Sequence, residues 1–188
     1  MIEALAALGE LPEGLELAGA DLGGCRFEGL ELTEASLRGA RFSDCRFERC
    51  ELTLVDVTDA TMHDLTFEAC RLQAVDFGAL ARDPIGISVR FERCDLSLAV
   101  FRGVDLRQCG FDGGVAREAA FVEVDLRGVT LAGLDLTGAV IRGCDLREAD
   151  LRGSTGYLLS PCDNRVRGLR IDVEGAVGLL AAVGVRWD

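Results

Sequence analysis

The stretch Val124–Gly153 reads VDLRG VTLAG LDLTG AVIRG CDLRE ADLRG, and it decides the fold class. Read in fives, it has a large apolar residue at the centre of every group and a smaller apolar residue two places earlier. The six central residues are Leu126, Leu131, Leu136, Ile141, Leu146 and Leu151. A helix repeats every 3.6 residues and a strand alternates every two, so a sustained period of five predicts stacked repeats.

The period of five extends over most of the chain. Central sites recur from Leu17 to Phe77 and again from Phe91 to Leu151, which makes 26 sites. All nine Phe of the chain occupy such sites, and seven of the eight Cys lie two places before one. This common register predicts one shared core, which should thin near Gly114 and Ala116, where the apolar residues become smallest.

Across roughly residues 15–153 the pattern resembles the pentapeptide repeat proteins. The resemblance implies an all-β solenoid, a right-handed quadrilateral β-helix in which four fives form one 20-residue turn. Its two apolar sites per five face inward, and its ends need caps because only stacking buries the core. We therefore assign residues 1–14 to an N-terminal cap, 15–153 to the β-helix and 154–188 to a C-terminal cap with a dimerisation helix.

One break interrupts the register at residues 78–90, because Phe77 and Phe91 are not separated by a multiple of five. Pro84 and Gly86 are turn residues within it. The break is either a bulge or short loop that kinks the solenoid, or a loop that carries contacts to a partner.

The end of the chain predicts a helix over residues 173–183, with Asp172 as N-cap and Gly184 as its stop. This helix is apolar on nearly all sides, whereas a surface helix is apolar along one stripe. One face can cap the solenoid, and a second copy of the chain is the economical partner for the others. The candidate dimer contacts are Val177, Leu179, Leu180, Val183 and Trp187.

The C-terminal stretch also makes the resemblance more specific. The segment RIDVEGAVGLLAAVGV, together with FERC, ACRL and DLSLAV, is similar to the mycobacterial fluoroquinolone resistance group, MfpA, and more distantly to the Qnr proteins. The resemblance implies a rod-shaped homodimer whose size, shape and negative surface imitate duplex DNA. Such a protein binds DNA gyrase, or the related topoisomerase IV, and protects it from quinolones or inhibits it. The chain lacks the two long inserted loops of the Qnr kind.

The charge of the chain agrees with such a partner. All 20 basic residues are Arg, and 32 acidic residues leave a net charge of −12, which argues against direct binding of nucleic acid. The charge is uneven, since residues 1–77 carry 16 acids and 6 Arg, and residues 78–188 carry 16 acids and 14 Arg.

Three rows of acidic residues recur at intervals of twenty, and the members of each row should stack on one another in adjacent turns of the solenoid. The candidate partner-binding residues are Asp105, Asp125 and Asp145; Glu28, Glu48 and Glu68; and Glu31 and Glu51. Each Asp of the first row is followed two places later by Arg, so that row either contacts gyrase or has a structural role in its turn. The glutamates are either contacts or ordinary solvated surface.

The sequence predicts no enzyme, cofactor or metal site. The cysteines at inward sites are expected to be buried reduced thiols, although Cys25 with Cys45 and Cys50 with Cys70 should be neighbours. His63 is the only histidine and has no matching set of ligands. No apolar run is long enough to span a membrane, so we expect a cytoplasmic protein. The main alternative function is a scaffold that binds another protein, and a narrower variant is self-resistance in a producer of a topoisomerase poison.

Overall fold

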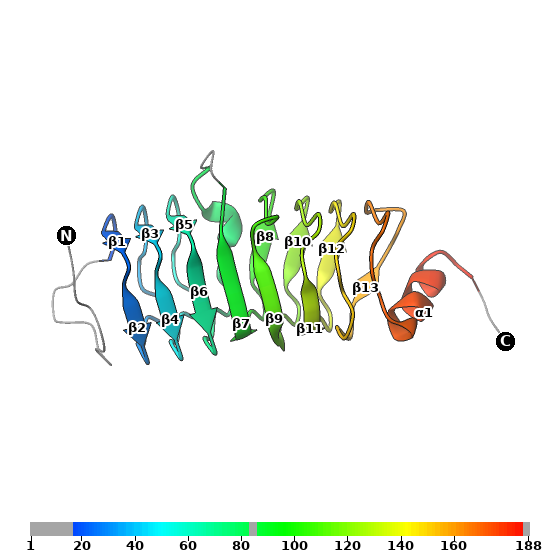
Figure 1. Ribbon diagram of the computed structural model, residues 1–188, viewed down its shortest axis with the longest axis horizontal. Coiled ribbons are helices and arrows are strands. Elements are labelled where there is room, and N and C mark those ends of the chain that lie inside the picture. The colour runs from blue at the N-terminus through cyan, green and yellow to red at the C-terminus, as the bar shows by residue number, and fades with distance from the viewer. Residues whose placement is uncertain (1–16, 83–85, 186–188) are drawn as a thin grey trace.

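A computed structural model describes residues 17–82 and 86–185. They form a β-solenoid of about seven turns with a single C-terminal helix, α1 (Val173–Ala182), at one end of the rod (Figure 1). The predicted β-solenoid with a C-terminal helix is thereby confirmed. The predicted N-terminal cap at residues 1–14 lies outside the described residues.

Every turn has four sides, which we number in chain order. The first side begins with β1, β3 and β5, and the second is a six-stranded parallel sheet of β2, β4, β6, β7, β9 and β11. Isolated parallel bridges from Glu31 to Asp95 hold much of the third side, and β8, β10, β12 and β13 form the fourth. The strands are β1 (Asp21–Gly23), β2 (Arg26–Glu28), β3 (Arg41–Ser43), β4 (Arg46–Glu48), β5 (Thr61–His63), β6 (Leu65–Glu68), β7 (Val89–Asp95), β8 (Val100–Arg102), β9 (Gly110–Val115), β10 (Ala120–Val122), β11 (Leu131–Asp135), β12 (Val140–Arg142) and β13 (Leu158–Leu159).

The core of the solenoid consists of the central sites of the fives, and all 26 of them are buried. Residues twenty apart lie in adjacent turns, so equal side chains stack along the rod. The rings of Phe27 and Phe47 stack at 4.4 Å between centroids, and those of Phe101 and Phe121 at 4.9 Å. Aromatic pairs of this kind contribute about 0.5–1.5 kcal/mol each beyond the area they bury.

The register break is an insertion of four residues in one turn. Leu65 pairs with Val89, an offset of 24 residues in place of 20. The insertion follows the short 3-10 helix η1 (Phe77–Ala79), whose N-cap Asp76 accepts a hydrogen bond from the Gly78 amide. The core passes the insertion without interruption, because the rings of Phe77 and Phe101 still stack at 4.8 Å and are nearly parallel.

The solenoid continues beyond the predicted boundary at Gly153. Parallel bridges join Asp145 to Arg165 and Asp150 to Arg170, so one more turn of the chain is stacked on the rod. The fives fade here because polar side chains replace apolar ones at inward positions. Ser154 accepts a hydrogen bond from the Leu134 amide, and the buried Asn164 accepts one from the Cys144 amide and donates to the Ile141 carbonyl.

Corners between the sides require an unusual backbone conformation. The residue two places after the central site has a positive φ in 24 of the 26 fives, and 13 of these residues are not glycine. L-residues with side chains visit this region at a cost, so the solenoid carries backbone strain at its corners.

Candidate partner-binding surfaces

The predicted ladder of Asp105, Asp125 and Asp145 is present on the first side, where parallel bridges join the three residues in consecutive turns. Each carboxylate accepts hydrogen bonds from the backbone amide and the guanidinium of the arginine two places later. The closest contacts from Arg107, Arg127 and Arg147 to these carboxylates are all 2.6 Å.

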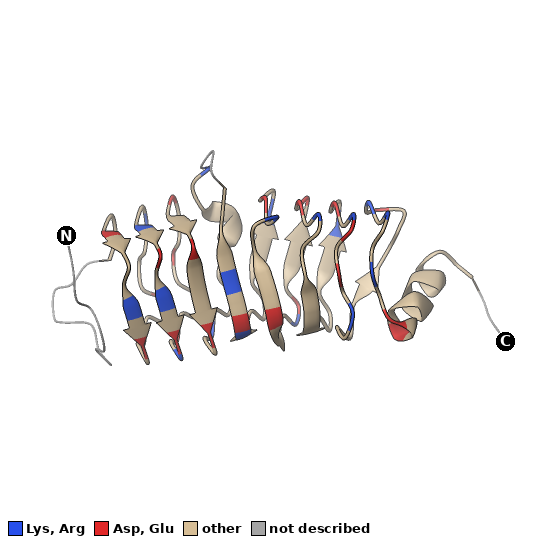
Figure 2. Cartoon of the chain, viewed as in Figure 1, with Lys and Arg blue, Asp and Glu red and all other residues tan. Residues whose placement is uncertain are grey.

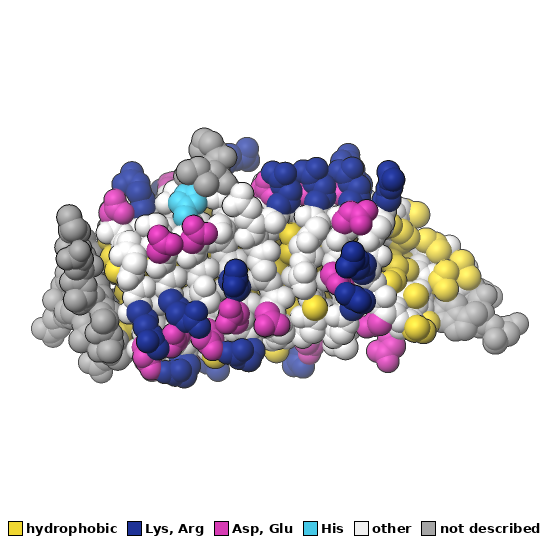
Figure 3. Space-filling view, in the orientation of Figure 1, with side chains coloured by type: hydrophobic (Ala, Val, Ile, Leu, Met, Phe, Trp, Pro, Cys, Tyr) yellow, Lys and Arg dark blue, Asp and Glu magenta, His cyan; other side chains and the backbone are white. Residues whose placement is uncertain are grey.

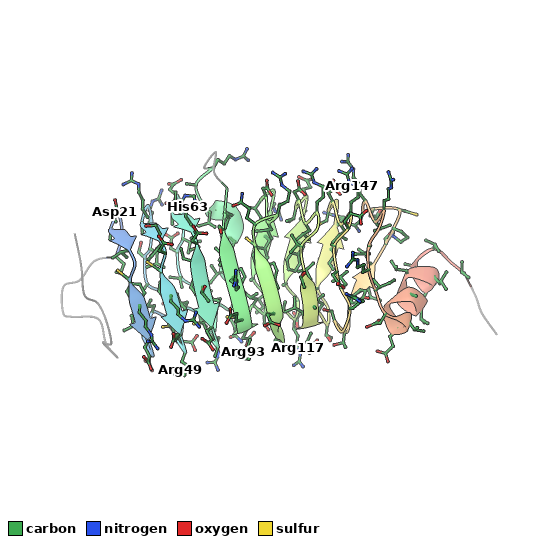
Figure 4. All side chains as sticks on the ribbon, in the orientation of Figure 1. Asp21, Arg49, His63, Arg93, Arg117 and Arg147 are labelled. Atoms are coloured by element: carbon green, nitrogen blue, oxygen red, sulfur yellow. The ribbon has the colours of Figure 1, made fainter. Side chains whose placement is uncertain are left out.

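These arginines neutralise the ladder and cover it. The Asp side chains become less exposed along the row, from 43% at Asp105 to 27% at Asp125 and 14% at Asp145. Arg147 holds the pKa of Asp145 down at about 2, chiefly through its side-chain hydrogen bonds. Arg side chains form a row along the upper edge of the rod in Figure 3, the edge at which Figure 4 places Arg147. The outermost charge of this column is therefore largely cationic.

The second predicted row, Glu28, Glu48 and Glu68, also stacks in register through β2, β4 and β6. Glu48 is buried between two arginines, 2.7 Å from Arg26 and 2.6 Å from Arg46. Arg46 also pairs with Glu68.

Two further arginines project from the corner beside this row. Arg49 pairs with Glu28, and Arg93 pairs with Glu68. Figure 4 shows both arginines at the lower edge of the rod. The row is therefore part of an ion-pair network.

The third row begins on the third side with Glu31 and Glu51, which are joined by a parallel bridge. Arg71 in the next turn pairs with Glu51 at 2.6 Å. Glu31 is exposed, and no residue in the described part of the chain forms an ion pair with it. Glu31 therefore differs from Asp105, which is also exposed but is paired with an arginine.

Charge is distributed unevenly among the sides of the rod. Figure 2 marks the charged residues along the chain. Outward positions of the second side hold six acids and six Arg, so this side is neutral overall. The third side holds six acids and two Arg and is the most acidic. Its acids are Glu31, Glu34, Glu51, Asp95, Glu118 and Asp135, and its arginines are Arg71 and Arg117. The spacing of twenty indicated the Asp ladder and both glutamate rows, whereas counting the charges on each side indicates the third side.

A hollow of about 350 Å³ lies beside the four-residue insertion, at the corner between the first and second sides. Asp64, Arg90, Arg107 and Gln108 are among the residues that line it. The hollow forms because the inserted chain replaces a regular five on the first side of this turn. Within residues 17–82 and 86–185, no group of three or more potential metal ligands occurs.

The predicted dimer contacts differ in burial, because α1 packs one of its faces against the last turn. Leu179 is half-buried and packs against the core, whereas Val177, Leu180 and Val183 are exposed. Trp187 lies outside the described residues. Apolar side chains therefore gather at this end of the rod, as Figure 3 shows. None of the helices in the described segments is long and apolar enough to cross a membrane.

Tyr157 fixes the start of α1. Its ring is buried beneath Gly175, where a Cβ would lie 1.8 Å from the Tyr157 hydroxyl oxygen. Asp172 caps the helix by accepting a hydrogen bond from the Gly175 amide at 2.9 Å. Helix and solenoid thus fit closely only because residue 175 has no side chain.

Three solved structures with a similar fold are each less than 25% identical to this chain. A trypsin-treated variant of QnrB1, a plasmid-mediated fluoroquinolone resistance protein, is 19% identical with a TM-score of 0.46, over 98% of both chains. Rfr23 from the cyanobacterium Cyanothece 51142 is 15% identical with a TM-score of 0.27, over 80% of this chain and 86% of its own. HetL from Nostoc sp. strain PCC 7120, involved in heterocyst differentiation regulation, is 16% identical with a TM-score of 0.21, over 80% and 84%.

A search of curated proteins found no match. Two family models do match, one for a pentapeptide repeat region at residues 20–81 and one for eight copies of the pentapeptide repeat at residues 119–155. Together they span more than half of the chain and lie on both sides of the four-residue insertion. The chain belongs to the pentapeptide repeat proteins.

Proposed function

We propose that this protein binds DNA gyrase, or a related type II topoisomerase, at the surface that receives duplex DNA, and thereby modulates the enzyme or protects it from quinolones and other poisons. The observation that carries the proposal is a negatively charged rod whose third side has the largest excess of acids over arginines, six against two. The similarity of the C-terminal stretch to MfpA supports the same partner.

The density of charge is of the order required of a DNA mimic. About seven turns at ~4.8 Å each give a rod of ~34 Å, and duplex DNA of that length carries about 20 negative charges. The chain carries −12. End-to-end assembly of two copies along one axis would lengthen the rod and keep this density.

The contact surface we propose is the acidic third side, with Glu31, Glu34 and Glu118 as its exposed carboxylates. The Asp ladder has a structural role in this proposal, because its carboxylates are paired with Arg107, Arg127 and Arg147. The protein would act as a homodimer joined through the exposed apolar residues of α1. Such an interface would cover side chains that otherwise face solvent.

A supercoiling assay with purified gyrase tests the function. The protein is titrated with and without ciprofloxacin, and both supercoiled product and cleaved DNA are measured. Loss of supercoiling, or fewer drug-induced breaks, at low micromolar protein is expected. Absence of both effects would contradict the proposal for gyrase, and the same titration with topoisomerase IV tests the related enzyme.

Charge-reversal variants then locate the surface. Glu31→Lys with Glu34→Lys should abolish the effect on gyrase, because the pair inverts the most accessible part of the third side. Glu92→Lys with Asp112→Lys on the neutral second side is the matched control, since it also reverses two negative charges. Equal loss in both variants would show that only total charge matters.

A further inference from the structure

Two exposed leucines stand out on the side wall of the rod. Among residues 17–82 and 86–139, Leu54 and Leu98 are the exposed large apolar side chains, each 52% exposed. Both occupy corner positions with positive φ, 58° at Leu54 and 64° at Leu98. Leucine is a poor choice there, since it has no polar group to bond locally and glycine adopts this conformation without strain.

The two leucines belong to one column at the corner between the third and fourth sides. The Leu54 amide donates to the carbonyl of Gln73, the Ala74 amide to that of Ser97, and the Leu98 amide to that of Arg117. Leu54, Ala74 and Leu98 therefore follow one another in three consecutive turns. At ~4.8 Å per turn the two leucines are about 10 Å apart along the rod. We call these three residues the leucine ridge.

Carboxylates surround the leucine ridge. Glu34 precedes Leu54 in the same column, because its amide donates to the Thr53 carbonyl, and Glu118 follows Leu98. Both glutamates are exposed, as are Asp56 and Asp76 on the adjoining fourth side. The ridge is thus a narrow apolar strip with negative charge at both ends and along one flank.

Neither burial nor backbone preference explains leucine at these two corners. Each side chain leaves half of its surface in water and holds its backbone in a conformation that bulky residues avoid. Eleven other non-glycine residues share this corner conformation, so the fold imposes it, and what lacks an explanation is the exposed apolar side chain at two corners of one column. From these observations we infer that the leucine ridge docks into an apolar cleft of a protein partner that carries Arg or Lys at both ends of that cleft.

This inference rests on the proposed function, because the basic DNA-binding surface of a topoisomerase is the partner we expect. The leucine ridge would add a buried apolar contact to an interface that, with charge alone, would have little specificity. Burying the exposed half of two leucines corresponds to an affinity gain of about 10- to 150-fold.

The test removes the leucines and relieves their strain in one step. Affinity for purified gyrase and melting temperature are measured for the wild type, for Leu54→Gly with Leu98→Gly, and for Leu54→Asn with Leu98→Asn. Glycine and asparagine both tolerate positive φ, so both pairs should keep or raise the melting temperature by a few degrees. The matched control is Ala69→Gly, which relieves an exposed corner at φ 50° away from the ridge.

We expect both double variants to bind gyrase about 10- to 150-fold more weakly while the control binds like the wild type. Binding within twofold of the wild type in either folded double variant would overturn the leucine ridge and leave the proposed function standing. A wild type that does not bind gyrase at all would overturn both.

Discussion

Gly114 offers the most direct test of the packing between turns. It lies in β9 two places before Ala116, at an inward-facing site where the fives elsewhere carry an apolar side chain. Its φ is +100°, and an added Cβ would lie 2.2 Å from the carbonyl oxygen of Cys94 and 2.9 Å from its amide nitrogen. Both are backbone atoms of the paired strand β7, which cannot move aside without breaking the ladder.

Gly114→Ala should therefore destabilise the protein strongly. Positive φ costs an alanine about 1–2 kcal/mol, and overpacking against fixed backbone costs about 1–3 kcal/mol. The sum, about 2–5 kcal/mol, corresponds to a drop in melting temperature of about 5–15 °C for a chain of this size. Thermal unfolding followed by circular dichroism measures it.

Gly110→Ala is the matched control, because it lies in the same strand and its added Cβ would meet only the Arg90 side chain, at 3.8 Å. We expect its melting temperature to stay close to that of the wild type. A Gly114→Ala variant that melts within 2 °C of the wild type would refute the reasoning, since it would mean that β7 and β9 can separate locally without cost.

Three further predictions concern the helix, the Asp ladder and the thiols. Gly175→Ala should detach α1 from Tyr157 and speed hydrogen exchange throughout the helix, whereas Gly178→Ala, where the nearest atom is 3.9 Å away, should stabilise α1 by up to about 1 kcal/mol. Because the folded-state pKa of Asp145 is lowered to about 2, its contribution to stability is present above pH ~4 and is lost as the pH falls towards 2. Denaturant titrations should accordingly show Asp145→Asn less stable than the wild type at pH 7, with the difference shrinking near pH 2. In a thiol titration of the native protein one cysteine should react quickly, and Cys162→Ser should abolish that phase, because Cys162 is exposed and the other seven are buried.

The core could be predicted from the sequence because its rule is local and periodic. Every central site from Leu17 to Leu151 is buried, and the helix start at Asp172 was predicted by an equally local rule, the N-cap. Both depend on the residue type at a fixed position. The four-residue insertion after η1 does not obscure this pattern, because the period of five resumes after it.

The features that the sequence did not predict depend on contacts between residues in adjacent turns of the solenoid. The last turn is held by Ser154 and Asn164, whose polar side chains satisfy backbone groups of the preceding turn and so hide the repeat. Gly114 is another example, because its need for glycine comes from the Cys94 backbone. The side-chain geometry that buries Glu48 between two arginines is likewise invisible in the spacing of the acids.

Parallel stacking in register has a general electrostatic consequence for this rod. Identical positions in successive turns lie about 4.8 Å apart, so a column of acids would repel itself unless cations lie between its members. Arg107 illustrates the solution, since it pairs with Asp105 in its own turn and lies 3.6 Å from Asp125 in the next. The regular acidic columns are therefore the ones the protein neutralises for its own stability. Carboxylates left without such partners, among them Glu31 and Glu34 on the third side, are the charges available to another molecule.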